Sequence, residues 1–294
     1  MALKGKEKKN SAKKNVVGYS YQDAAAQTTD RKAPFAVVEA YKSIRTNLMF
    51  LMGQANGNVI AISSANAGEG KSTTSVNVAI AFSQLGGKVL LVDGDLRRSS
   101  IHKKMKIENE IGVSNVLAGL NNLDEAIVSV NQSLDVLPAG QIPPNPSELL
   151  GSQRFADVME QLRQQYSYIV IDTPPINIVT DALIIAPRTD GLILVVRDGY
   201  TQNEAIRRAI DAAEFANINI LGAVMNGANP KRGGRYSYRK YNSRYYRYGY
   251  GKGKGYGYGY GYGYGYGYGS SYGGYGYSSS TPKPEPIQSN TEND

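Results

Sequence analysis

Short apolar runs alternate with segments of helical periodicity between Pro34 and Pro230 of this 294-residue chain. Six runs are predicted to be strands, at residues 58–65, 88–95, 134–140, 166–175, 190–199 and 218–227. Apolar positions recur at helical spacing in residues 39–52, 74–86, 152–165 and 202–216. Apolar strands that alternate with helices are typical of a parallel sheet covered on both faces. The pattern therefore predicts an α/β fold over residues 34–230, a doubly wound parallel sheet with helices on both faces.

The pattern ends abruptly after Pro230. Of the 23 tyrosines, six precede this point and seventeen follow it, many alternating with glycine. Such a segment has almost no aliphatic residues with which to offset the entropy of ordering. Residues 231–294 are predicted to be a disordered Tyr/Gly-rich tail, and residues 1–33 a flexible basic segment.

The charge of +8 is unevenly distributed, with +5 on residues 1–32, −4 on 33–230 and +7 on 231–294. Basic ends suggest an anionic partner such as lipid or nucleic acid, although they also serve as solvated ends. The chain has no cysteine, which excludes disulfides and thiolate metal sites and fits a reducing compartment. It has neither an apolar run long enough to span a membrane nor a secretory signal, so we expect a cytoplasmic protein.

A phosphate-binding loop is predicted between the first strand and the following helix. Residues 65–72, Ala-Asn-Ala-Gly-Glu-Gly-Lys-Ser, match the Walker A pattern G-x-x-x-x-G-K-[ST] except at the first position. Backbone N–H groups here can point at phosphate oxygens, aided by the helix N-terminus. Lys71 would neutralise the β- and γ-phosphates, and Ser72 would bind Mg²⁺. The predicted nucleotide-binding residues of the loop are Ala67, Gly68, Glu69, Gly70, Lys71, Ser72 and Thr73.

Three carboxylates stand at the ends of apolar strands. Asp93 and Asp95 end the second predicted strand, and Asp172 ends the strand in residues 166–175. An unpaired carboxylate is costly at such a position unless something binds it, and Mg²⁺ with its waters is one candidate. Any one of the three could instead cap a turn.

These segments together resemble the Walker A, A′ and B motifs of bacterial tyrosine kinases, the P-loop kinases of capsule and exopolysaccharide operons. Residues 137–150 are similar to a further segment of that family, and the resemblance covers roughly residues 34–230. It implies ATP and Mg²⁺ as cofactors, with Ser72, Asp95 and Asp172 as metal ligands. Asp93 and Asp95 would hold metal and receive the tyrosine hydroxyl, and which of them is the base stays open.

Two further residues have suggested roles. Asn226 resembles the family's base-contacting region. Arg97 would either assist the transfer or form a surface ion pair.

The resemblance also implies an autokinase whose substrate is its own tail, phosphorylated in trans. About 40 residues of Gly-rich chain span roughly 30–40 Å, enough to reach a neighbouring subunit. The predicted acceptors are Tyr256, Tyr258, Tyr260, Tyr262, Tyr264, Tyr266, Tyr268, Tyr272, Tyr275 and Tyr277. We also expect regulation of capsular or extracellular polysaccharide synthesis and export. A membrane-bound polysaccharide co-polymerase would act as activator and recruit the protein to the inner face of the membrane.

The sequence departs from related families at two places. Partition and septum-site ATPases carry a signature Lys early in the loop, where this chain has Asn66, which favours the kinase branch. The family's interface motif E-x-x-R-x-x-R appears as Glu39, Lys42 and Arg45, and Lys42 lacks the bidentate geometry of Arg. A ring-like homo-oligomer is therefore a weaker expectation, and an ordinary amphipathic helix is the alternative.

Two other functions compete with the autokinase. One is a P-loop switch ATPase of the partition or septum-site type without protein kinase activity. The other is a nucleic-acid binder that uses the interleaved basic and aromatic residues 231–254. We do not expect nucleic acid as a partner, because binding it would leave all three Walker motifs without a role.

Overall fold

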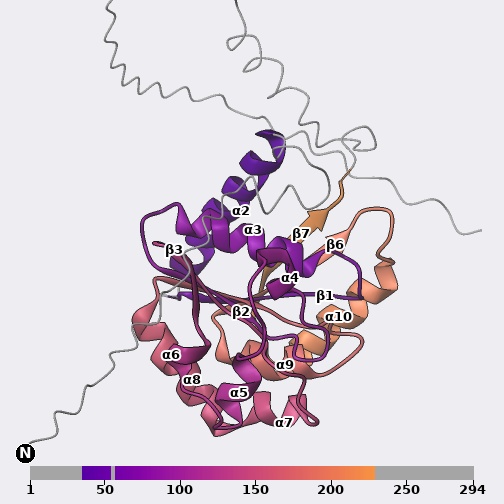
Figure 1. The fold of residues 1–294 in the computed structure, drawn as a ribbon. Coiled ribbons are helices and arrows are strands. Elements are labelled where there is room, and N and C mark those ends of the chain that lie inside the picture. Colours follow the sequence, from indigo (N-terminus) through magenta and orange to yellow (C-terminus); the bar gives the residue numbers. More distant parts are fainter. Residues whose placement is uncertain (1–34, 54–56, 229–294) are drawn as a thin grey trace, which may run out of the picture. The chain divides into compact units, whose positions relative to one another are not determined.

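The computed structural model describes residues 35–53 and 57–228, in which seven strands form one sheet (Figure 1). The strands are β1 (Val59–Ser64), β2 (Val89–Asp93), β3 (Val128–Asn131), β4 (Leu134–Leu137), β5 (Tyr168–Asp172), β6 (Gly191–Arg197) and β7 (Ile220–Asn226). Their order across the sheet is β3-β4-β2-β5-β1-β6-β7. Each neighbouring pair of these strands is parallel except β3–β4. The predicted doubly wound α/β sheet is confirmed.

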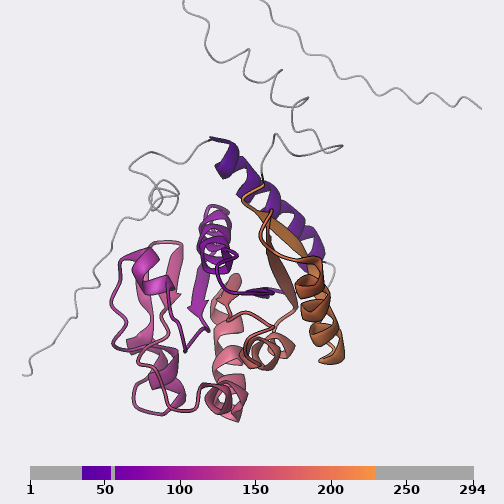
Figure 2. The ribbon, with the colours of Figure 1, turned by 90° about the vertical axis from the view of Figure 1, so that its right-hand side faces the viewer.

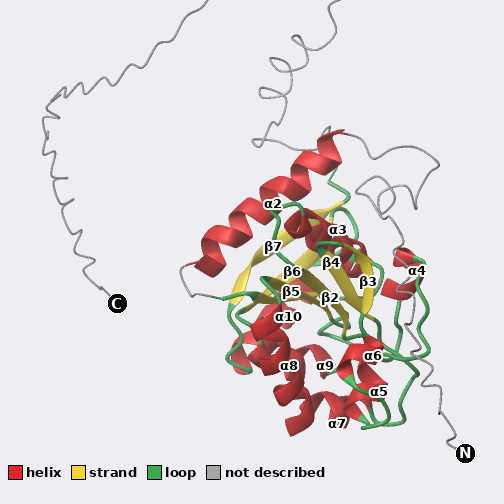
Figure 3. Ribbon diagram, turned by 60° about the vertical axis from the view of Figure 1, so that its left-hand side comes forward, coloured by secondary structure: helices red, strands yellow, loops and turns green. Residues whose placement is uncertain are grey.

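Helices cover both faces of this sheet (Figures 1 and 3). They are α2 (Phe35–Gly53), α3 (Lys71–Ser83), α4 (Ile101–Met105), α5 (Val113–Leu117), α6 (Leu123–Ala126), α7 (Pro146–Gly151), α8 (Gln153–Gln165), α9 (Asp181–Ile185) and α10 (Asn203–Phe215), with a 3₁₀ turn at Ala186–Arg188. Alternate residues of β1 explain the layers. Ile60 and Ile62 pack with α2, α3 and α4 on one face, whereas Val59 and Ala61 pack with α5 to α10 on the other.

Two helices show how the sequence specifies this packing. In α8, Phe155, Met159 and Leu162 form the buried stripe, and the Ser152 hydroxyl caps the helix by accepting a hydrogen bond from the Phe155 N–H. In α10, the buried stripe at positions 205, 209 and 213 consists of alanine. Side chains this small let the helix lie close to the sheet.

The two edge strands differ from expectation. β3 was not predicted, because its four residues Val-Ser-Val-Asn bury only Val130 and pair antiparallel with β4. β7 was expected to be covered on both faces, and this is wrong: Ala223 and Met225 are exposed. Helix α2 runs alongside β7 and packs against it (Figure 2).

The topology gathers the ends of the parallel strands at one edge of the sheet. Asp93 of β2 is paired in register with Asp172 of β5, and Asp172 is also level with Ile62 of β1. The loop after β1 therefore lies beside both carboxylates. None of the helices within 35–53 and 57–228 is both long and apolar enough to cross a membrane.

Candidate active site

The loop between β1 and α3 has the backbone shape that its glycines allow. Gly68 and Gly70 have φ angles of +79° and +98°, in the left-handed region where a Cβ is unfavourable. Helix α3 begins at Lys71, directly after Gly70. The first N–H groups of a helix have no partners within it, so its N-terminus favours an anion, and Lys71, Ser72 and Thr73 of this first turn line a pocket.

Side chains from distant segments hold this loop. The buried Glu69 carboxylate accepts hydrogen bonds from the Asn66 N–H at 3.1 Å and from the Thr201 hydroxyl at 2.9 Å. Arg197 donates to the Gly68 carbonyl at 3.0 Å. The prediction grouped Glu69 with the nucleotide-binding residues, but its carboxylate turns into the protein because these donors surround it. The expected contact of Glu69 with phosphate, through its backbone N–H, stays a prediction.

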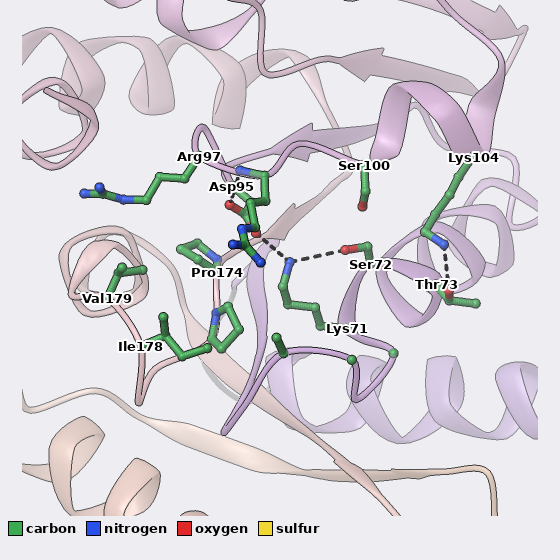
Figure 4. Close-up of a pocket in the computed structure, with 15 residues that line it drawn as sticks. Lys71, Ser72, Thr73, Asp95, Arg97, Ser100, Lys104, Pro174, Ile178 and Val179 are labelled. Atoms are coloured by element: carbon green, nitrogen blue, oxygen red, sulfur yellow. Dashed lines mark hydrogen bonds and ion pairs between the residues drawn. The ribbon is translucent and has the colours of Figure 1, made fainter. Parts of the chain in front are cut away.

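The Lys71 ammonium donates to three side-chain oxygens from separate segments, and Figure 4 shows its contacts with Asp95 and Ser72. Its Nζ is 2.9 Å from Asp95 Oδ2, 3.4 Å from Asp172 Oδ2 and 3.2 Å from Ser72 Oγ. Ser75 also donates to Asp172 Oδ1 at 3.0 Å. The structure thus brings together four residues that the sequence predicted for the site, namely Lys71, Ser72, Asp95 and Asp172.

Electrostatics couple these groups. Burial raises the pKa of the Asp172 carboxyl, and the Lys71 charge and the Ser72 and Ser75 hydroxyls offset this only in part. Burial by itself would lower the pKa of Lys71, but the charges of Asp172 and Asp95 outweigh it and raise that pKa. Lys71 therefore stays protonated at neutral pH and neutralises a buried acidic cluster.

The same oxygens can hold a divalent cation. The donors that attract the Lys71 ammonium, two carboxylates and one hydroxyl, are the hard oxygen ligands that Mg²⁺ prefers. Within residues 35–53 and 57–228, no group of three or more His, Cys, Asp or Glu side chains could form a metal site of its own. This donor set fits Mg²⁺ that completes its coordination with water and substrate phosphates.

Asp93 occupies a different position from Asp95. Its fully buried carboxylate accepts hydrogen bonds from the N–H groups of Asp95, Ser100 and Ile101 at 3.3, 3.1 and 3.1 Å. Burial, followed by the charge of Asp172, raises the pKa of Asp93 to about 7. Asp93 does not line the pocket. Its carboxylate therefore organises the 95–101 loop, and the expectation that Asp93 receives a substrate hydroxyl stays a prediction.

Arg97 is committed to an ion pair. Its Nε and Nη2 donate to the two carboxylate oxygens of buried Asp181 at 2.7 and 3.1 Å, and Nη2 also donates to Ser147 Oγ at 2.8 Å. Ser147 lies in α7, within the 137–150 segment that resembled the kinase family. Of the two roles considered for Arg97, the ion pair is the one the structure contains.

A cavity of about 680 Å³ opens beside Lys71. Besides loop residues and Asp95, it is lined by residues that the sequence reasoning missed, namely Arg98, Ser100, Lys104, Pro174, Pro175, Ile178 and Val179. Pro174 and Pro175 follow Asp172 so closely that their position could have been inferred. The sequence did not indicate Lys104, because this residue lies outside the loop motif, in the short helix α4. Only the fold brings its Nζ to 3.0 Å from Thr73 Oγ1.

The remaining predicted residues lie outside this cavity. Asn226 ends β7, and its amide donates to the Glu69 carbonyl at 3.0 Å, so it contacts the phosphate loop. In α2, Glu39 and Lys42 form a half-exposed ion pair of 2.7 Å, whereas Arg45 donates to the Ala81 carbonyl of α3 at 2.9 Å. The ten predicted acceptor tyrosines and residues 1–34 lie outside the described residues.

Comparison with known proteins gives the family. The AAA domain family matches residues 57–220. Tyrosine-protein kinase YwqD of Bacillus subtilis (strain 168) is 39% identical over 201 residues, which cover 68% of this chain and 85% of that protein. The solved kinase domain of Escherichia coli tyrosine kinase ETK is 34% identical, with a TM-score of 0.66, and the match covers 74% of this chain and 84% of that one.

A more distant match is the septum site-determining protein MinD from Pyrococcus horikoshii OT3, complexed with Mg-ADP. It is 26% identical, with a TM-score of 0.50, over 57% of this chain and 69% of that one. The phosphate loop and these likenesses make the chain a nucleotide-binding protein. The chain belongs to the bacterial tyrosine kinases, the P-loop family that its three Walker motifs resemble.

Proposed function

We propose that this kinase transfers the γ-phosphoryl group of ATP to tyrosines of its own residues 231–294, with Mg²⁺ as cofactor. The observation that carries the proposal is the position of Lys71, 2.9 Å from Asp95 and 3.4 Å from Asp172 at the mouth of a pocket next to a phosphate loop. Few functions other than phosphoryl transfer or nucleotide hydrolysis use a lysine, two strand-end carboxylates and a helix N-terminus together.

Each residue then has a role in the transfer. The loop amides and Lys71 hold the β- and γ-phosphates, and binding the nucleotide draws the ammonium away from its two carboxylates. Ser72, Asp95 and Asp172 would hold Mg²⁺, which would supply positive charge to the phosphate oxygens. The bond between the β-bridging oxygen and the γ-phosphorus breaks in the transfer.

In this proposal Asp95 receives the acceptor's proton. Its Oδ1 accepts from the Arg98 N–H at 3.0 Å, which fixes the carboxylate at the pocket wall. The phenol oxygen bonds to the γ-phosphorus, ADP leaves, and the phenol proton passes to Asp95. A phenol has an ordinary pKa near 10, so the proton leaves during or after the transfer rather than before it.

Three wider parts of the proposal rest on the family resemblance. The acceptors are Tyr256–Tyr277, modified in trans. The output is control of capsular or extracellular polysaccharide synthesis, with a membrane-bound activator that recruits the protein to the membrane. Glu39 and Lys42, half-exposed on α2, contribute to a homo-oligomer.

The test is the intact mass of the full-length protein incubated with Mg·ATP, followed by peptide mapping. Lys71→Met is the inactive variant, and Lys103→Met, an exposed lysine of α4, is the matched control. Phosphate-sized additions confined to Tyr256–Tyr277 in the wild type and in Lys103→Met, and absent from Lys71→Met, support the proposal. ATP consumption without phosphotyrosine would identify a switch ATPase instead.

A further inference from the structure

The cavity beside Lys71 has two chemically different sides (Figure 4). On one side, Thr73 and Lys104 present a hydroxyl and an ammonium. On the other, Pro174, Pro175, Ile178 and Val179 form an apolar wall. Phosphate binding requires the polar side but does not explain the apolar wall.

The apolar wall is built rigidly into the fold. The Pro174 carbonyl accepts a hydrogen bond from the Ser63 hydroxyl at 2.7 Å, and the Ile176 N–H donates to the Ser64 carbonyl at 2.9 Å. The Asn177 side-chain amide donates to the Ala205 carbonyl of α10 at 2.9 Å. Despite this anchoring, 57% of Ile178 is exposed, so a fixed loop presents a large aliphatic side chain to the cavity.

The apolar wall lies at the end of the site where the γ-phosphate of the nucleotide would bind. Pro174 comes two residues after Asp172, whose carboxylate contacts Lys71, so the wall adjoins the group that holds the γ-phosphate. Thr73 lies in the first turn of α3, on the opposite side of Lys71 (Figure 4). The nucleoside then extends past Thr73, and the wall is left for the second substrate.

We propose that Pro174, Pro175, Ile178 and Val179 form the subsite for the aromatic ring of the acceptor tyrosine, with its hydroxyl directed to Asp95. This inference rests on the proposed function, because it names how that function's substrate is held. An apolar wall beside a carboxylate matches a phenol, which has an apolar body and one polar tip. Serine has no ring to place there, so the subsite selects tyrosine.

The occupant is the neutral part of the chain's own tail. Residues 255–281 contain ten tyrosines and no charged residue, whereas residues 231–254 contain seven tyrosines and nine Lys or Arg. The cavity is lined by Arg98 and Lys104, whose charges repel a basic segment, besides Arg97, which is paired with Asp181. The subsite therefore favours Tyr256–Tyr277 over the tyrosines in the basic segment.

The described part of the chain ends close to this site. Asn226, two residues before that end, donates to the Glu69 carbonyl of the phosphate loop. The proposed occupant is therefore attached to the domain through the strand whose last residue contacts the phosphate loop.

Steady-state kinetics of full-length protein on a synthetic peptide of residues 270–280 test the subsite. Ile178→Asp and Ile178→Ala are compared with Ile142→Asp and Ile142→Ala, since Ile142 is 71% exposed and does not line the cavity. We expect Ile178→Asp to raise the KM for peptide about tenfold and Ile178→Ala to raise it less, with the KM for ATP within about twofold of wild type. The Ile142 variants should match wild type.

Three outcomes can be told apart. If the KM for ATP rises together with that for peptide, the wall holds the nucleoside and the inference is overturned. The same holds if Ile178 and Ile142 variants behave alike while the wild type phosphorylates the peptide. If the wild type phosphorylates neither peptide nor tail, the proposed function itself fails.

Discussion

The contact between Asn226 and the phosphate loop gives a prediction whose size follows from the structure. Gly70 has a φ of +98°, and a Cβ at this position would overlap the Asn226 amide nitrogen. Gly86, just past the other end of α3, has a φ of +88° with nothing within 4 Å of the position where a Cβ would lie. Alanine at either position meets the same backbone penalty, but only at Gly70 must a neighbouring side chain move.

The magnitudes add from two sources. An L-residue in the left-handed region costs about 1–2 kcal/mol. Displacing the Asn226 amide also breaks its 3.0 Å hydrogen bond to the Glu69 carbonyl, which is worth about 0.5–1.5 kcal/mol. We therefore expect Gly70→Ala to lower the free energy of unfolding by about 2–3 kcal/mol, and Gly86→Ala by about 1–2 kcal/mol.

Urea denaturation of the two alanine variants, of Asn226→Ala and of the double variant Gly70→Ala/Asn226→Ala measures these quantities. Asn226→Ala alone should cost about 1 kcal/mol, because it removes the same hydrogen bond. The double variant should then be more stable than additivity predicts, by about 1 kcal/mol. Additive costs, or equal costs for Gly70→Ala and Gly86→Ala, would show that β7 does not support the loop in the way described.

Three further variants probe the charges around the site. Lys71→Met removes the cation between two buried carboxylates, so it should lower the free energy of unfolding by about 3–5 kcal/mol at pH 8. Because burial raises the pKa of Asp172, this loss should shrink as the pH falls and Asp172 protonates, which urea denaturation over a series of pH values measures. The pKa of Asp93 is raised to about 7 in the folded state from a usual 3.8, so its contribution to stability is lost as pH rises through that range. Asp93→Asn should remove this part of the pH dependence of the free energy of unfolding. Parallel pH profiles for the variant and the wild type would contradict the assignment. Arg97→Ala leaves the fully buried Asp181 carboxylate with Ser147 as its partner. Thermal unfolding should show a loss of stability of about 2–3 kcal/mol, which Arg97→Lys restores in part. A variant with unchanged stability but no activity would point to a catalytic arginine instead.

Local patterns predicted most of the fold and the residues that the structure gathers around Lys71. The strands and long helices follow from runs of apolar residues, and Lys71, Ser72 and the strand-end aspartates follow from spacing within short segments. β3 was not predicted, because four residues with one buried side chain show no periodic pattern of apolar positions. The exposed face of β7 could not be seen either, since an apolar run does not reveal whether its strand lies at the edge of the sheet.

The roles of neighbouring side chains depended on partners far away in sequence. Asp93 and Asp95 are equivalent in sequence, yet only Asp95 reaches the cavity, because three backbone N–H groups of the following loop enclose the Asp93 carboxylate. Arg97 was ambiguous until Asp181, 84 positions away, appeared as its ion-pair partner. Spacing within a motif cannot report contacts of this range.

The same reasoning links the phosphate loop to the end of the described chain. Three side chains that follow β6 or end β6 and β7 hold the loop: Arg197 on Gly68, Thr201 on Glu69 and Asn226 on Glu69. Asn226 lies five residues before Lys231, where the predicted tail begins. Because Asn226 donates to the Glu69 carbonyl, the last described strand is tied directly to the phosphate loop. β7 has α2 beside it and exposes Ala223 and Met225, so the support of the loop depends on an edge strand that is covered on only part of its surface.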